Sequence, residues 1–150
     1  TKVKIVKRGV NNKLSGDLIV AEIDNEMNPL PGAGQSIWKH YGVMKNDLSK
    51  KGGTLEDGDT RVTTPSPNIK CPFKKFLHVV MPSFDSSAQI LRDKSLSMLY
   101  RNILEKAIAE EAKTIVLPVL GIRSLSYPVE NGVNVMLVAI KDFLSVKNNQ

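Results

Sequence analysis

Phe76-Leu-His-Val-Val-Met-Pro82 is the stretch of sequence that decides the fold. It is an apolar run of strand length that a proline stops, and a second apolar run follows at 115–120. Between them, apolar residues recur every three or four positions, which predicts an amphipathic helix from Leu96 onward with Ser95 or Asp93 as its N-cap. Strands without polar alternation are typical of a sheet that is buried on both faces.

Further elements extend this pattern toward both ends. An apolar run at 17–21 follows a Ser-Gly turn and predicts a buried strand, and 61–64 predicts a strand that prolines end. We also expect helices at 36–41, ending at Gly42, and at 133–144, where apolar residues return to helical spacing. Because strands that alternate with helices favour a mostly parallel sheet with helices on both faces, we predict an α/β fold.

Size and composition predict one intracellular domain. With 150 residues, of which 41% are hydrophobic, the chain is long enough for a single core and short for two. A lone cysteine cannot form an internal disulfide, and the sequence shows neither a signal peptide nor an apolar run that could span a membrane. We therefore expect a cytoplasmic or nuclear protein without membrane contact. Because the chain starts at Thr1, we expect residues 1–150 to be one domain of a larger multidomain protein, whose other domains contact it.

The charge of the chain favours anionic partners. The formal net charge is +6, and the first thirteen residues contain five basic and no acidic side chains. Such a surface attracts RNA or an acidic protein, and the lysines at 70–75 would add to it. The alternative is a solvated basic face without a partner.

Six short strings occur in a characteristic order along the chain. They are Gly58-Asp59, Phe76-Leu-His-Val-Val-Met-Pro82, Leu99-Tyr-Arg-Asn-Ile-Leu104, Ile115-Val-Leu-Pro118, the strand at 17–20 and Tyr127-Pro128. By their order and spacing along the chain, these strings resemble the macro domain, the ADP-ribose-binding family, over nearly the whole chain. The resemblance implies a three-layer α/β/α fold with a mixed, mostly parallel central sheet. Family members usually add a strand and a helix after the helix at 133–144, where this sequence stops.

The resemblance also implies a ligand site built from glycine-rich loops. In the family, an aspartate contacts adenine, and two loops wrap the diphosphate with backbone N–H groups, which needs glycine because the main chain must approach closely. In register, Gly9 precedes Val10 at the adenine position, and valine cannot accept a hydrogen bond. The first diphosphate loop contains Pro31, which has no N–H to donate. It retains Gly32, Ala33 and Gly34.

The second loop departs further from the family pattern. It comprises Gly121, Ile122, Arg123, Ser124, Leu125 and Ser126. The resemblance implies glycines where Arg123 and Ser126 stand. Arg123 could bind a phosphate through its planar guanidinium, fill the pocket or point into solvent.

Two residues are candidates for a catalytic role. After the strand at 17–20 the family has Asn-Ala-Ala-Asn, whose last asparagine contacts the distal ribose and helps to position water in hydrolytic members. The matching residue is Asp24 or, with one inserted residue, Asn25. In a strand, Glu22, Asp24 and Glu26 would project to one side and repel a diphosphate. The alternative, which we favour, is that they form a solvated acidic edge.

The remaining chemistry-bearing residues are expected to be structural. His78 lies in an apolar strand and is predicted to be a hydrogen-bonded core residue, Trp38 is expected in the core, and Cys71 is expected to be a packed side chain rather than a nucleophile. Zinc-ligand spacing, a Walker motif and a catalytic triad pattern are all missing from the sequence. We therefore expect neither metal nor cofactor.

These observations predict a divergent macro-like binding module with weak or no ADP-ribose binding and little or no hydrolase activity, whose partner is RNA or protein. The alternative is a functional ADP-ribose reader, or an ADP-ribosyl hydrolase that acts on mono-ADP-ribosylated proteins through Asp24 or Asn25.

Overall fold

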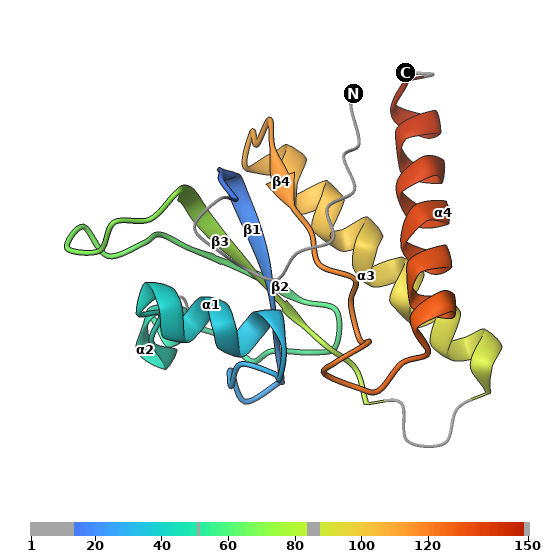
Figure 1. Cartoon of the computed structure of the whole chain (residues 1–150), viewed down its shortest axis with the longest axis horizontal. Coiled ribbons are helices and arrows are strands. Elements are labelled where there is room, and N and C mark those ends of the chain that lie inside the picture. The colour runs from blue at the N-terminus through green and yellow to red at the C-terminus, as the bar shows by residue number, and fades with distance from the viewer. Residues whose placement is uncertain (1–13, 51, 84–87, 149–150) are drawn as a thin grey trace.

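A computed structural model describes residues 14–50, 52–83 and 88–148. Within these residues, a four-stranded sheet has helices on both faces (Figure 1). The strands are β1 (Gly16–Ile23), β2 (Thr60–Thr63), β3 (Phe73–Val80) and β4 (Ile115–Val116). The helices are α1 (Ala33–Tyr41), α2 (Lys45–Ser49), α3 (Gln89–Ala109) and α4 (Val129–Asn148).

The sheet is mixed and mostly parallel, as predicted. Its strand order is β2-β3-β1-β4, with β1 parallel to both of its neighbours and β2 antiparallel to β3. In Figure 1, α1 and α2 lie on one side of the sheet and α3 and α4 on the other. The three-layer α/β/α architecture is therefore confirmed.

Strand β1 contributes to two separate cores. Leu18 and Val20 pack into the cluster that contains the buried side chains of α3 and α4, whereas Ile19, Ala21 and Ile23 pack into the cluster beneath α1 and α2. All five side chains are at most 1% exposed. Because side chains alternate between the faces of a strand and both faces are covered here, the apolar run shows no polar alternation.

Several boundaries differ from the prediction. Helix α1 begins at Ala33 rather than at residue 36, and α4 spans Val129–Asn148 rather than 133–144. The strand expected at 115–120 ends at Val116, and the chain then leaves the sheet toward Pro118, which has no N–H for a ladder. Helix α3 begins at Gln89, so neither Ser95 nor Asp93 is its N-cap. The carboxylate of Asp93 instead accepts a hydrogen bond from Gln89 Nε2 (2.8 Å). By contrast, α1 ends at Tyr41 as expected, because the next residue is a glycine with φ of 62°.

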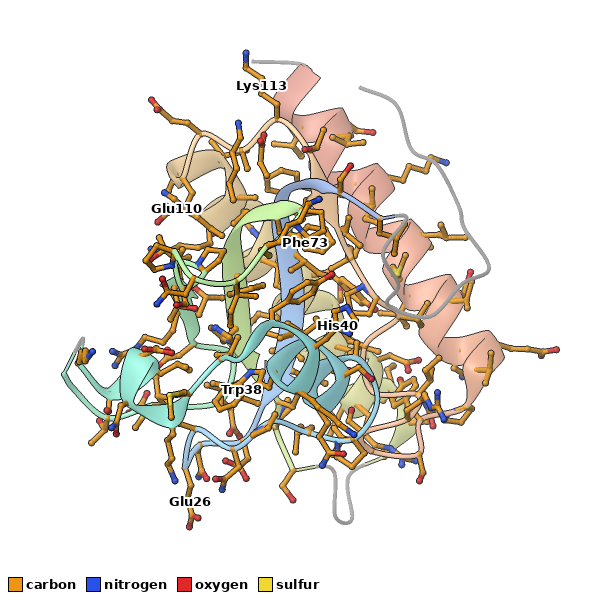
Figure 2. The ribbon with its side chains drawn as sticks, turned by 60° about the vertical axis from the view of Figure 1, so that its left-hand side comes forward. Glu26, Trp38, His40, Phe73, Glu110 and Lys113 are labelled. Atoms are coloured by element: carbon orange, nitrogen blue, oxygen red, sulfur yellow. The ribbon has the colours of Figure 1, made fainter. Side chains whose placement is uncertain are left out.

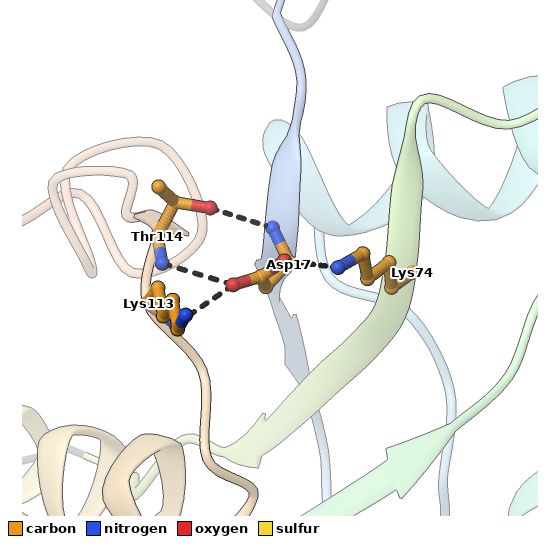
Figure 3. Close-up of polar contacts among 4 residues, drawn as sticks. All are labelled: Asp17, Lys74, Lys113 and Thr114. Carbon is orange, nitrogen blue, oxygen red and sulfur yellow. Dashed lines mark hydrogen bonds and ion pairs between the residues drawn. The ribbon is translucent and has the colours of Figure 1, made fainter.

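A surface carboxylate holds the short strand β4 against β1 (Figure 3). Asp17 Oδ2 accepts hydrogen bonds from the backbone N–H groups of Lys113 (2.7 Å) and Thr114 (3.2 Å). Its other oxygen lies 3.0 Å from Lys74 Nζ. These hydrogen bonds and the ammonium group keep the pKa of Asp17 below its usual range. The side chain thus supplements a strand pair that is only two residues long.

His78 is a core residue, as predicted. It is fully buried, and Trp38 Nε1, on the α1 side labelled in Figure 2, donates to its Nδ1 (3.4 Å). The other ring nitrogen, Nε2, lies 2.8 Å from Thr63 Oγ1. Because an indole N–H can only donate, Nδ1 is the acceptor and Nε2 carries the proton. Burial lowers the pKa of His78 to about 4, against a weaker opposing effect of Asp47.

This buried histidine predicts acid sensitivity. The unfolded chain takes up a proton at His78 near pH 6.5, whereas the folded chain resists protonation until about pH 4. Stability should therefore decrease as pH falls through this window, by about 3 kcal/mol in total. Urea unfolding at several pH values tests this, with His78→Gln as the comparison. Equal pH dependence in the two proteins would contradict the prediction.

Candidate functional site

Two loops meet at one end of the sheet. The first loop, residues 24–32, joins β1 to α1, and the second loop, residues 117–128, joins β4 to α4. Because β1 and β4 are parallel neighbours, both loops leave the carboxyl ends of their strands on the same side, as Figure 1 shows. Ligands of α/β proteins bind at this end of the sheet.

Glu22, the penultimate residue of β1, is a buried acid that lies between the two loops. The residue is only 3% exposed. Its Oε2 accepts hydrogen bonds from the backbone N–H of Gly121 (3.0 Å) and from Ser124 Oγ (2.6 Å). Burial raises the pKa of Glu22, while these two hydrogen bonds act in the opposite direction. Two donors of the second loop are therefore already bound to a side chain of the same chain.

The second loop is a tight turn closed by its own backbone. The carbonyl oxygen of Gly121 accepts hydrogen bonds from the N–H groups of Leu125 (3.0 Å) and Tyr127 (2.9 Å). Gly121 has φ of 83°, which glycine adopts without strain. Ser126 has φ of 54°, so it keeps a left-handed conformation where the family resemblance implies glycine. Arg123 does not adopt a positive φ. Of the two residues that stand in place of expected glycines, Ser126 thus has the left-handed conformation that glycine favours and Arg123 does not.

Arg123 brings the second loop into contact with the first. A Cβ atom placed on Gly32 would lie 3.1 Å from Cβ and 3.5 Å from Cδ of Arg123, so the aliphatic part of the arginine covers this glycine. Gly32 itself has φ of 99°. Arg123 remains exposed overall. Of the three roles considered for it, the structure combines two, because its stem closes the gap between the loops while the residue reaches solvent.

Gly34 is required by the packing of α1 on β1. A Cβ atom at this position would lie only 2.4 Å from the carbonyl oxygen of Glu22. The same oxygen accepts a hydrogen bond from Leu30 N–H (3.0 Å), which fixes the first loop against the strand. The glycine therefore allows close approach of two backbone segments of the protein, whether or not a ligand is bound.

Asp24 organises the first loop around itself. Its Oδ1 accepts hydrogen bonds from the N–H groups of Glu26 and Asn28, both at 2.9 Å, and its Oδ2 accepts one from Asn28 Nδ2 (3.1 Å). Aspartate commonly binds its own loop in this way. Both oxygens of this catalytic candidate thus have partners within the loop, whereas the second candidate, Asn25, is exposed.

The expected acidic edge does not form. Strand β1 ends at Ile23, so Glu22, Asp24 and Glu26 do not follow one strand and do not share a side. Glu22 is buried, Asp24 lies in the turn, and Glu26 is exposed and extends away from the ribbon in Figure 2. The prediction of a solvated edge was therefore wrong for Glu22. A signal was available in the sequence, because an acid directly after a run of buried residues needs a hydrogen-bonding partner.

The other predicted site residues have structural contacts. Ala33 packs against the core beneath α1, and Leu125 packs against the core beneath α3. Ile122 lies against α4, since a Cβ atom on Gly132 would be 2.9 Å from its Cγ2. Gly9 and Val10, predicted at the adenine position, lie outside the described residues.

Two described cavities lie away from the loops. One, of about 460 Å³, is lined by residues of β2 and α3, among them Arg61 and Asn102. The other, of about 270 Å³, lies beside Tyr41 and Thr63. Among the described residues, no cluster of three or more His, Cys, Asp or Glu side chains could hold a metal ion. None of the helices in this part of the chain has the length and apolar character that crossing a membrane requires.

Comparison with protein families identifies the fold. A family model for the macro domain matches residues 34–136, which is more than half of the chain. The chain belongs to the macro domain family. The resemblance seen in the sequence is thereby confirmed.

Solved macro domains share this architecture. The Oceanobacillus iheyensis macrodomain with ADP has a TM-score of 0.72 and 21% identity, and the match covers 88% of this chain and 71% of that one. The macro domain of ganglioside induced differentiation associated protein 2 (GDAP2) has a TM-score of 0.71 and 21% identity, covering 87% of this chain and 64% of that one. At this level of identity, the likeness shows the fold alone.

A curated relative is considerably longer than this macro domain. The Protein GDAP2 homolog of Drosophila pseudoobscura pseudoobscura is 24% identical over 153 residues. The match covers 93% of this chain and 27% of that protein. The chain thus spans little more than a quarter of the length of the curated relatives it matches.

The close packing of α1 on β1 predicts that Gly34→Ala destabilises the macro domain. The new methyl group would collide with the Glu22 carbonyl, and backbone on both sides would have to move. We expect a loss of about 2 kcal/mol in the free energy of unfolding, as for other overpacked sites, measured by urea denaturation.

Gln35→Ala is the matched control, because Gln35 is the next residue of α1 and is exposed. This variant should stay within about 0.5 kcal/mol of the wild type. If Gly34→Ala is as stable as the control, the close approach of α1 and β1 is not a constraint.

Proposed function

We propose that this macro domain is a binding module with weak or no affinity for ADP-ribose and little or no hydrolase activity. The observation that carries the proposal is the buried carboxylate of Glu22, which accepts the hydrogen bonds of Gly121 N–H and Ser124 Oγ. A diphosphate at the second loop would have to displace this carboxylate or lie beside it. Either arrangement costs free energy, because hydrogen bonds are lost or like charges approach in a poorly solvated place.

The size of this effect is large enough to decide affinity. A hydrogen bond to a charged group contributes ~1.5–3 kcal/mol, so two lost donors correspond to roughly 3–6 kcal/mol. Since each 1.4 kcal/mol changes a dissociation constant about tenfold, affinity would fall by roughly two to four orders of magnitude. The contact between Arg123 and Gly32 adds a steric obstacle between the loops.

Hydrolysis is disfavoured for a separate reason. A residue that positions a water molecule needs a free hydrogen-bonding atom near the bond to be cleaved. The oxygens of Asp24 are bound to the N–H groups of Glu26 and Asn28 and to the Asn28 side chain. Asn25 is exposed next to this turn. Neither candidate is therefore held in a geometry for attack on a glycosidic bond.

The alternative is a functional ADP-ribose reader or ADP-ribosyl hydrolase. It draws support from family membership and from the Oceanobacillus iheyensis macrodomain, which was solved with ADP. However, a shared fold does not carry a binding site with it when the residues of the site differ. The affinity for ADP-ribose therefore distinguishes the proposed function from this alternative.

Among macromolecular partners, RNA draws little support from the described surface. In the segment 70–75, Lys74 pairs with Asp17 (3.0 Å) and Lys75 with Glu110 (2.7 Å), so two of its three lysines are partly neutralised. The segment therefore offers less free positive charge than its sequence indicates. RNA binding stays a prediction of the basic composition, and binding of RNA that weakens steeply with salt would support it.

Titration with ADP-ribose by calorimetry tests the proposal. We expect no measurable heat of binding, or a dissociation constant weaker than micromolar, because Glu22 occupies two donors of the second loop. The Oceanobacillus iheyensis macrodomain titrated with ADP serves as the positive control.

An affinity in the nanomolar range would overturn the proposal. Incubation with a mono-ADP-ribosylated protein provides the enzymatic arm, in which we expect no release of ADP-ribose. Release that Asp24→Ala or Asn25→Ala abolishes would favour the hydrolase alternative.

A further inference from the structure

Two donors of the second loop converge on one oxygen atom. The N–H of Gly121 and the hydroxyl of Ser124 lie 3.0 Å and 2.6 Å from Oε2 of Glu22. Backbone N–H groups in a tight turn with a left-handed glycine, together with a hydroxyl, form the kind of concave site that binds oxyanions. The occupant here is a carboxylate from β1, a different part of the chain.

The presence of a carboxylate at this position needs a reason. Glu22 lies on the face of β1 that also carries Leu18 and Val20, where neighbouring positions are filled by apolar side chains. Burying a carboxylate costs free energy that an apolar or amide side chain would not require. Space filling alone therefore does not explain the charge, whereas two convergent donors do.

We infer that Glu22 is an internal ligand whose carboxylate occupies an oxyanion site in the second loop and thereby determines that this domain rejects phosphate-bearing ligands. The inference deepens the proposed function and rests on it. It names Glu22 as the specificity-determining residue and assigns the site to oxyanions. Exclusion has two components, because the carboxylate both takes up the donors and repels a second anion.

A purely structural role for Glu22 makes a different prediction. If the residue only fastens the second loop to β1, its replacement lowers stability and leaves phosphate affinity unchanged. If it is an internal ligand, its replacement exposes Gly121 N–H and Ser124 Oγ and creates affinity. Stability alone cannot separate the two roles, so affinity is the decisive measurement.

The experiment compares Glu22→Ala and Glu22→Gln with the wild type by titration with ADP-ribose and with inorganic pyrophosphate at fixed ionic strength. We expect Glu22→Ala to bind at least tenfold more tightly than the wild type, because both the charge and the occupant are removed. Glu22→Gln should gain at least threefold, because it loses the charge but keeps an oxygen that can accept from the loop. Glu26→Ala is the matched control, since it removes an exposed charge from the same region, and its affinity should stay within twofold.

A second substitution identifies the groups that bind the anion. Adding Ser124→Ala to Glu22→Ala should remove at least half of the gain in affinity, because one of the two donors is lost. A gain that Ser124→Ala leaves intact would come from general loosening of the loop, and it would overturn the inference.

The remaining outcomes separate the inference from the proposed function. Folded Glu22 variants with unchanged, weak affinity would overturn the inference and leave the proposed function standing. Nanomolar affinity of the wild type would overturn both. Circular dichroism and thermal unfolding establish folding, and if Glu22→Ala is unfolded, the nearly isosteric Glu22→Gln decides, so that no gain in this variant overturns the inference.

Discussion

A carboxylate buried at the end of a sheet must be hydrogen-bonded, and this requirement at Glu22 organises the two loops at the carboxyl end of β1. Its partners, Gly121 and Ser124, belong to a loop that begins nearly a hundred residues later in the chain. The start of that loop is also held from α3, where the hydroxyl of Tyr100 accepts a hydrogen bond from Leu120 N–H (2.7 Å). Its far end is held by Tyr127, whose hydroxyl binds Asp93 of α3. The strand, the loop and the helix layer are therefore joined at one place.

The sequence was sufficient to predict the layers of the fold but not all element boundaries. Apolar runs buried on both faces required a covered sheet, and glycine at 42 marked the end of α1. The run at 115–120 was misjudged because burial and strand pairing are different properties. Leu120 is fully buried, yet it lies in a loop. The start of α3 was misplaced because the carboxylate of Asp93 binds the hydroxyl of Tyr127 in the second loop and does not cap the helix.

For the candidate site, residue types indicated which loops to inspect but not the partners of their side chains. The family register indicated both loops, and the structure brings Gly32 of the first and Arg123 of the second into contact. The partners of Glu22 could not be derived in the same way, because Gly121 and Ser124 are distant from it in sequence. The role of Asp24 was equally hidden, since binding its own loop and binding a ribose require the same side chain.

The glycine at position 34 has a consequence for how such domains are compared with one another. Its lack of a side chain answers a demand of the protein's own interior, because the carbonyl of Glu22 stands where a methyl group would go. Replacing this glycine would therefore disturb the fold even in a macro domain that binds no nucleotide. A glycine at this position is thus evidence that α1 packs closely on β1, and it is not by itself evidence that the ligand site is functional.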